Sequence, residues 1–184
     1  MQKIRKVFWI VRLCFILPGI NWSDDAFCKD LARWKSILHL KISDRDALAE
    51  ILSCKPEFRN LLIYRNNHRP IFRRWIALWY RPLETLYIET PKIEGGLYIQ
   101  HGFATMIAAK YIGENCWINQ QVTIGYNGQG DPPVIGNNVM ITCGAKVLGD
   151  IVIGDNAVIG ANAVVVKNVE SGAIMGGIPA KKIK

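Results

Sequence analysis

An aliphatic residue returns at every sixth position through the stretch from residue 135 to residue 170. The residues that set this period are Ile135, Ile141, Val147, Ile153, Ile159 and Val165. A second apolar set, mostly of small residues, follows each of them by four positions: Val139, Ala145, Ile151, Ala157, Ala163 and Val169. A period of six fits neither an α-helix nor an alternating strand, whereas a flat-sided coil of short parallel strands requires it. The spacing therefore predicts a parallel β-helix whose interior is lined twice on each side.

The same stretch also repeats at eighteen residues. When its first half is laid over its second half, the matching places are Ile135/Ile153, Gly136/Gly154, Asn138/Asn156, Ile141/Ile159, Ala145/Ala163 and Val147/Val165. One coil is therefore three hexapeptides, and stacked coils about 4.8 Å apart bury a continuous core. Gly136 and Gly154 are expected at corners with a left-handed backbone, which glycine adopts at little cost. An ordinary β-sandwich is the alternative, but it does not explain consecutive hits at one spacing.

The positive charge of the chain belongs to its first half. Residues 1–82 hold 16 Lys and Arg against 7 Asp and Glu, a balance of +9, whereas residues 83–184 hold 7 against 8, a balance of −1. A nucleic-acid partner would require a recognisable binding module in the basic half, and the sequence has none. An anionic membrane surface fits the charge better. The five cysteines are odd in number and lack metal-ligand spacing, which predicts buried, reduced thiols in a cytoplasmic protein.

The first 82 residues are expected to be all-helical. The predicted helices are residues 1–17, residues 24–42 with Ser23 as cap, a helix capped by Asp44, one from Pro56 and one from Pro70. The first is too short and too charged to span a bilayer, so it either packs against its neighbours, which we expect, or lies on a membrane. The last alternates aromatic and arginine residues, which is compatible with a core position and with a membrane interface. His39 and His68 stand alone and are expected to be structural.

The composition changes after Pro82, where glycine becomes frequent and charged residues become rarer. We therefore predict an α+β chain, with an all-helical region over residues 1–82 and a β-helix over residues 83–184. The six-residue spacing is interrupted around residues 101–109 and across residues 126–134, YNGQGDPPV. Sequence rich in Gly and Pro cannot continue a strand, so the second interruption predicts a loop that leaves the coil. Binding and catalytic residues concentrate on such loops, and we expect the site there.

From Pro91 onward the sequence resembles the hexapeptide-repeat acyltransferases, especially the serine acetyltransferases and related polysaccharide O-acetyltransferases. The resemblance rests on KIEGGLYIQHG around His101, QQVTIG at residues 120–125, GAKVLGDIVIGDNAVIGANAVV from Gly144, and the ending GGIPAKKI. It implies a left-handed parallel β-helix, a homotrimer, acetyl-coenzyme A (acetyl-CoA) as co-substrate and no metal. Carbonic anhydrases of this fold need three histidines at a zinc ion, and this half of the chain has one.

The resemblance implies that His101 is the catalytic base. Acetyl transfer from a thioester to a hydroxyl needs a base for the hydroxyl proton and a donor for the oxyanion. A histidine side chain can take and return a proton near neutral pH. Glu89 is the predicted carboxylate partner, although a backbone carbonyl could orient the imidazole instead. The competing interpretation is a structural histidine at a corner of the coil.

The resemblance also implies a groove for coenzyme A between neighbouring subunits. The matching positions are Gly125, Cys143, Gly144, Ala161 and Asn162, with Lys181 and Lys182 near the nucleotide phosphates. Small residues eighteen apart, such as Cys143 above Ala161, would form an open wall for the pantetheine arm. The two lysines could equally be a solvated basic tail.

The acceptor positions depart from the serine acetyltransferase pattern. Gln100 stands where that family has an acidic residue, and the segment GQGDPP, which includes Asp131, lacks the Arg-His pair that grips a carboxylate. We therefore predict a saccharide hydroxyl as acceptor, on a capsule or cell-surface glycan precursor. The basic helical half would hold the enzyme in the cytoplasm at the inner face of the membrane. A serine O-acetyltransferase of cysteine biosynthesis is the alternative, and a non-catalytic β-helix scaffold is the second.

Overall fold

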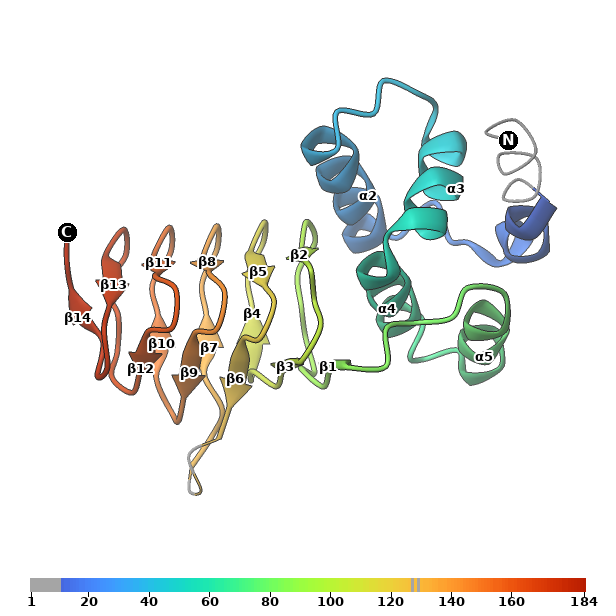
Figure 1. The fold of residues 1–184 in the computed structure, drawn as a ribbon. Coiled ribbons are helices and arrows are strands. Elements are labelled where there is room, and N and C mark those ends of the chain that lie inside the picture. Colours follow the sequence, from blue (N-terminus) through green and yellow to red (C-terminus); the bar gives the residue numbers. More distant parts are fainter. Residues whose placement is uncertain (1–10, 127, 129) are drawn as a thin grey trace. The chain divides into compact units, whose positions relative to one another are not determined.

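The computed structural model describes residues 11–126, 128 and 130–184, and the chain divides into two compact units (Figure 1). The first, Met1–Leu83, is helical over its described residues, and the second, Glu84–Lys184, is built of short strands. The division falls one residue after the predicted boundary at Pro82. The basic cluster of Lys3, Arg5 and Lys6 in the first predicted helix lies outside the described residues.

Six helical segments form the described part of the first unit. Residues 11–16 are helical and lead into the 3₁₀ helix η1 (Leu17–Gly19), followed by α2 (Asp25–Ile37), α3 (Asp44–Cys54), α4 (Pro56–Arg65) and α5 (Pro70–Trp79). Two caps differ from the prediction. Asp24, not Ser23, accepts the backbone N–H of Phe27 (3.0 Å), and Ser43, not Asp44, caps α3. Ser and Asp stand side by side at both starts and either can cap, so the backbone conformation decides which residue does.

A buried ion pair joins α2 to α4. Arg65 Nε and Nη2 donate to the two carboxylate oxygens of Asp30 at 2.8 and 3.2 Å, and the Asp30 side chain is fully buried. Trp34 of α2 and Phe58 of α4 also pack edge to face, with ring centroids 5.2 Å apart. Within the described residues, the first unit has no helix long and apolar enough to cross a membrane.

The second unit is a left-handed parallel β-helix of hexapeptide repeats, so the predicted α+β fold class is confirmed. Sheet 1 contains β1 (Leu86–Ile88), β3 (Thr105–Ile107), β6 (Thr123–Gly125), β9 (Lys146–Leu148) and β12 (Val164–Val165). Sheet 2 contains β4 (Tyr111–Ile112), β7 (Val134–Ile135) and β10 (Val152–Ile153). Sheet 3 contains β2 (Tyr98–Gln100), β5 (Trp117–Asn119), β8 (Met140–Ile141), β11 (Val158–Ile159), β13 (Ile174–Gly176) and β14 (Lys181–Lys182). The chain visits sheets 1, 2 and 3 in turn, and Figure 1 shows the resulting stack of coils.

The residues of the six-residue period form the core of the β-helix, as predicted. Each of the six aliphatic residues is at most 1% exposed, and each of the second apolar set is at most 7% exposed. Residues eighteen apart in the sequence are paired on neighbouring strands. Ile141 lies beside Ile159 in sheet 3, and Val147 lies beside Val165 in sheet 1. Like residues therefore stack on like residues along the axis.

The prediction of left-handed glycines at corners is wrong for Gly136 and Gly154. The left-handed residues are Asn138 and Asn156, two positions later, with φ of 55° and 60°. Asparagine tolerates this region better than most residues because its short polar side chain can bond locally. Glycine is required at 136 by close packing, since a Cβ there would lie 2.9 Å from the backbone nitrogen of Asp155 on the next coil.

Sheet 3 ends in a strand of opposite direction. β14 pairs antiparallel with β13, with Met175 opposite Lys182 and Gly176 opposite Lys181, whereas every other strand pair is parallel. The segment before β14 also bonds to the last strand of sheet 1, through Ala180 N–H and Val164 O at 2.8 Å. The final segment of the chain therefore covers the last coil on two of its sides.

The cysteines are all free thiols, but their burial differs from the prediction. Cys116 is buried, Cys28 and Cys143 are partly buried, and Cys14 and Cys54 are exposed. The exposed pair lies on solvent-facing positions of helices, where the neighbouring apolar residues, not the thiols, face the core.

Candidate active site

His101 lies on an enlarged corner of the β-helix between β2 and β3. Gln100 pairs with Asn119 and Met106 pairs with Thr123, so five residues, 101–105, connect these positions where the next coil uses three, 120–122. The two extra residues account for the interrupted period. His101 is exposed and has a φ of 55°, a left-handed conformation that costs a residue with a Cβ about 1–3 kcal/mol. Ala104 in the same corner and Gln121 in the next one are left-handed too, so the enlargement and the exposure of this corner, not its backbone angle, single out His101.

The imidazole of His101 has no hydrogen-bond partner among the residues that the structure describes. Glu89, its predicted partner, follows β1 at the edge of sheet 1 and is exposed; its backbone N–H bonds to Ile107 O (2.9 Å), and its carboxylate makes no bond to His101. Gln100, immediately before His101, accepts a hydrogen bond from the side-chain amide of Asn119 at 3.3 Å. Neighbouring coils therefore orient Gln100, while the ring of His101 stays available.

Four predicted coenzyme A positions lie in one column with the His101 corner. Backbone bonds connect successive corners: Gln121 N–H to Phe103 O (3.1 Å), Gly144 N–H to Gln120 O (3.0 Å) and Asn162 N–H to Cys143 O (2.9 Å). Cys143 consequently stacks on Ala161 and Gly144 on Asn162, as the eighteen-residue spacing predicts. Cys143 and Gly144 are partly buried, and Ala161 and Asn162 are exposed. The column presents small side chains and backbone in line with His101.

Gly125 lies away from this column, at the other end of β6, where sheet 1 turns toward sheet 2. Its carbonyl accepts the backbone N–H of Gly149 (2.9 Å), and a Cβ placed on Gly125 would meet no atom within 4 Å. Open space therefore borders this glycine within the single chain.

The predicted loop leaves the coil directly after Gly125 and projects from it (Figure 1). Eight residues separate Gly125 from Val134, where the next coil has three between their partners Leu148 and Val152. Asp131, a predicted acceptor-binding residue on this loop, forms an ion pair with Lys110. This hydrogen bond raises the pKa of the Lys110 ammonium. The loop is thus tied to the preceding coil through the carboxylate expected to contact substrate.

Of the two predicted phosphate-binding lysines, one already has a partner. Lys182 Nζ lies 2.7 Å from a carboxylate oxygen of Glu170, and this contact lowers the pKa of Glu170. Lys181 precedes it on β14 and is exposed.

Gln120 was missed by the sequence reasoning. Its side-chain oxygen is buried and has no hydrogen-bond partner among the described residues. A buried acceptor without a partner costs about 1–3 kcal/mol. Gln120 stands in the corner column, next to the enlarged His101 corner, and its side-chain oxygen lacks a donor among the described residues. The signal was present in the sequence, because Gln120 falls at a corner position filled by the small residues Cys143 and Ala161 in later coils.

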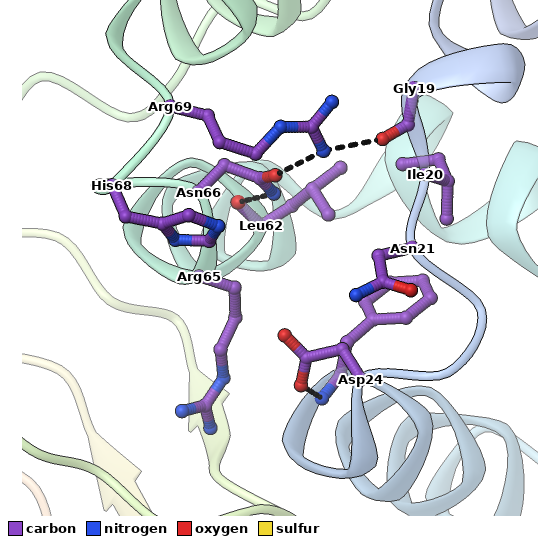
Figure 2. A pocket seen from close by; sticks show the side chains of 10 residues that line it. Gly19, Ile20, Asn21, Asp24, Leu62, Arg65, Asn66, His68 and Arg69 are labelled. Carbon is purple, nitrogen blue, oxygen red and sulfur yellow. Dashed lines mark hydrogen bonds between the residues drawn. The ribbon is translucent and has the colours of Figure 1, made fainter.

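A cavity of about 350 Å³ lies in the helical unit and is lined by several polar residues (Figure 2). Arg69 Nη1 donates to Gly19 O at 2.7 Å, and Arg65 is held by the buried Asp30. His68, which was expected to be structural, lies at the rim and is exposed. Arg69, the N-cap residue of α5, thus connects the end of η1 to the start of α5. Across the described residues, no three His, Cys, Asp or Glu side chains are grouped closely enough to hold a metal ion.

The sequence of this chain matches a known family and is similar to known proteins. The family described as "Bacterial transferase hexapeptide (six repeats)" matches residues 132–167. The serine acetyltransferase of Synechococcus elongatus is 35% identical over 157 residues, which cover 77% of this chain and 64% of that protein. The serine acetyltransferase of Helicobacter pylori strain 26695 is 38% identical over 146 residues, covering 73% of this chain and 85% of that protein.

Solved structures agree in fold. The serine acetyltransferase of Neisseria gonorrhoeae in complex with serine superposes with a TM-score of 0.67 at 27% identity, over 86% of this chain and 68% of that one. The Brucella abortus serine acetyltransferase in complex with coenzyme A gives a TM-score of 0.67 at 22% identity, over 94% of this chain and 72% of that one. Together with the Helicobacter pylori match and the His101 corner, these likenesses assign the chain: it belongs to the serine acetyltransferase family of hexapeptide-repeat acyltransferases.

Proposed function

We propose that this protein transfers an acetyl group from acetyl-CoA to a hydroxyl, with His101 as general base and free serine as the acceptor. The observation that carries the proposal is the exposed His101 on an enlarged corner, at the head of a column of small corner residues. The names of the relatives support acetyl transfer to serine. The scaffold alternative gives no reason for an enlarged corner that presents an unpaired histidine.

The chemistry assigned to His101 is proton transfer. Its imidazole nitrogen accepts the proton of the acceptor hydroxyl while the hydroxyl oxygen bonds to the acyl carbon. The carbon–sulfur bond then breaks, and the imidazolium returns its proton to the leaving sulfur. A ring without a protein hydrogen bond in the single chain needs an orienting partner, and either a carboxylate such as Glu89 from a neighbouring subunit or a backbone carbonyl would serve.

The corner column has the properties that acetyl-CoA requires. This co-substrate supplies the activated thioester when bound. Cys143 and Ala161 offer a smooth wall, and the unpartnered side-chain oxygen of Gln120, once it turns toward the groove, would accept a donor such as a pantetheine amide. The exposed Lys181 is free of the Glu170 contact that holds Lys182, so of the two it is the better phosphate partner. We further propose that a homotrimer completes this groove, and a trimeric mass by light scattering at micromolar concentration would support it.

Serine replaces the saccharide that the sequence predicted as acceptor. The relatives are serine acetyltransferases, and nothing in the comparisons favours a glycan. The departures at Gln100 and in the loop remain, and Asp131 is engaged with Lys110. We therefore expect serine to bind more weakly than in enzymes with an arginine in that loop, since a guanidinium pairs with a carboxylate through two hydrogen bonds.

The test is to follow release of free thiol from acetyl-CoA with L-serine as acceptor. His101→Ala should lower kcat by about 100-fold or more, the usual contribution of a general base, and leave acetyl-CoA binding by calorimetry nearly unchanged. His68→Ala, which changes an exposed histidine of the helical unit, is the control and should keep full turnover. Near-normal turnover in His101→Ala would move the base elsewhere.

A second arm separates the acceptors. L-serine should release thiol, and D-serine and a panel of nucleotide sugars should not. Release with a sugar but not with L-serine would refute the serine assignment while leaving acetyl transfer intact.

A further inference from the structure

Helix α5 carries an apolar face that the described residues of the helical unit leave exposed. Ile71, Trp75 and Leu78 follow one another at intervals of four and three residues, which places them on one side of the helix. They are 86%, 41% and 70% exposed. Ile76, on the opposite side, is fully buried and anchors α5 to the unit. The sequence was compatible with a core position and with a membrane interface for this helix. The Ile76 side takes the core position, and the exposed side is the one on which an interface could form.

The apolar face continues onto the neighbouring helical segment, residues 11–16. Trp75 Nε1 donates to Phe15 O at 2.8 Å, and the Phe15 ring stacks on Trp79 with centroids 4.0 Å apart. Phe15 is nevertheless 47% exposed, and Val11, one turn earlier, is 50% exposed. Leu13 and Ile16 on the other side of this segment are buried. We call Val11, Phe15, Ile71, Trp75 and Leu78 the α5 apolar surface.

The charges around the α5 apolar surface are positive. Arg74 lies beside it on α5 and is exposed, and Arg73 is exposed one position earlier. α5 contains no acidic residue, and residues 1–83 carry the whole positive balance of the chain, +9. A second copy docking face to face would bring these arginines against their equivalents, which opposes association. A surface of anionic phospholipid headgroups would complement them.

We propose that the α5 apolar surface docks peripherally on an anionic lipid bilayer. The apolar side chains would enter the boundary between headgroups and acyl chains, as amphipathic helices do, and the arginines would lie at the phosphates. Trp75 suits this depth, since an indole prefers the interface between apolar and wet surroundings. The proposal does not depend on acetyl transfer, because none of these residues belongs to the His101 corner.

The test is cosedimentation of the full chain with vesicles. Binding is expected to phosphatidylcholine vesicles containing 30% phosphatidylserine, to weaken as salt increases, and to be absent with phosphatidylcholine alone. Ile71→Ser with Leu78→Ser should lower the partition coefficient by about tenfold per residue. Arg74→Gln should lower it by about fivefold, from roughly 1 kcal/mol per basic residue near such a surface.

Matched controls lie on the same unit. Ile42→Ser, at a residue 39% exposed between α2 and α3, and Arg45→Gln, exposed on α3, should bind as the unchanged protein does. Because Ile71 and Leu78 face solvent, the double variant should keep its circular dichroism spectrum. Equal loss in test and control variants would overturn the proposal. So would an unaltered vesicle affinity accompanied by dissociation of a larger assembly, which would make this surface an interface between copies.

Discussion

Gly136→Ala should destabilise the middle coils of the β-helix, and the structure fixes the size of the effect. The new Cβ would lie 2.3 Å from the Asp155 carboxylate, 2.9 Å from its backbone nitrogen and 3.0 Å from Ile153 O. The carboxylate can swing away only by releasing the backbone N–H of Asn137, which it holds at 2.7 Å. A lost bond to a charged acceptor at an exposed site costs about 1 kcal/mol, and the coil displacement about 1–3 kcal/mol, giving about 2–4 kcal/mol together.

Gly125→Ala is the matched control, because both glycines stand in the coils at negative φ and only Gly136 lacks room. Hydrogen exchange of the peptides covering β7 to β11, followed by mass spectrometry, measures the change. Gly136→Ala should speed exchange by roughly 30- to 1000-fold, the equivalent of those energies. Gly125→Ala should slow it about two- to fivefold, since alanine restricts the unfolded chain. Equal behaviour of the two variants would refute the argument that contact with the next coil selects glycine.

Two further outcomes follow from ion pairs. Asp30→Ala should lower the free energy of unfolding by about 3–5 kcal/mol, measured by urea unfolding followed at 222 nm, because it leaves the buried Arg65 charge without its partner. Asp30→Leu combined with Arg65→Met should recover most of that loss. An Asp30→Ala variant as stable as the unchanged protein would show that water reaches Arg65. The depressed pKa of Glu170 means that its contact with Lys182 stabilises β14 at neutral pH, and that this contribution disappears as the pH falls below about 4.5 and through the lowered folded pKa. Glu170→Gln should therefore speed amide exchange in β14 at pH 7, and the difference from the unchanged protein should shrink as the pH falls below about 4.5. A difference that stayed constant through this acid range would contradict the linkage.

The core of the β-helix could be predicted because burial follows sequence spacing there. Each coil repeats the same geometry, so Ile135 and Ile153 meet the same surroundings and the period alone places both inside. Corners are different, because two solutions compete at each one. Asn138 takes the left-handed turn while Gly136 makes room for the next coil, and only the distance to Asp155 separates these roles. The sequence shows that a corner needs small or conformationally permissive residues. It does not show which of these residues adopts the left-handed conformation.

The candidate site was predictable in part. The interruption of the period at His101 and the small residues eighteen apart were visible, and the structure aligns them in one column. The buried oxygen of Gln120 was not visible, because satisfaction of a hydrogen bond depends on which neighbours the fold supplies. The relatives support the alternative acceptor, serine, better than the predicted saccharide. The saccharide prediction rested on absent side chains, such as an arginine in the loop, and a neighbouring subunit or another loop can provide such groups.

The reversed direction of β14 limits how this molecule can polymerise. A parallel β-helix that stops at an open coil offers unpaired N–H and C=O groups, onto which another coil can add, and repetition of that step makes a fibre. β14 occupies the rim of sheet 3 in the opposite sense, and the residues before it cross the last strand of sheet 1. Its exposed lysines add charge where an incoming strand would dock. β14 and the segment before it therefore hinder another parallel coil from adding to sheets 1 and 3 at that end of the described stack.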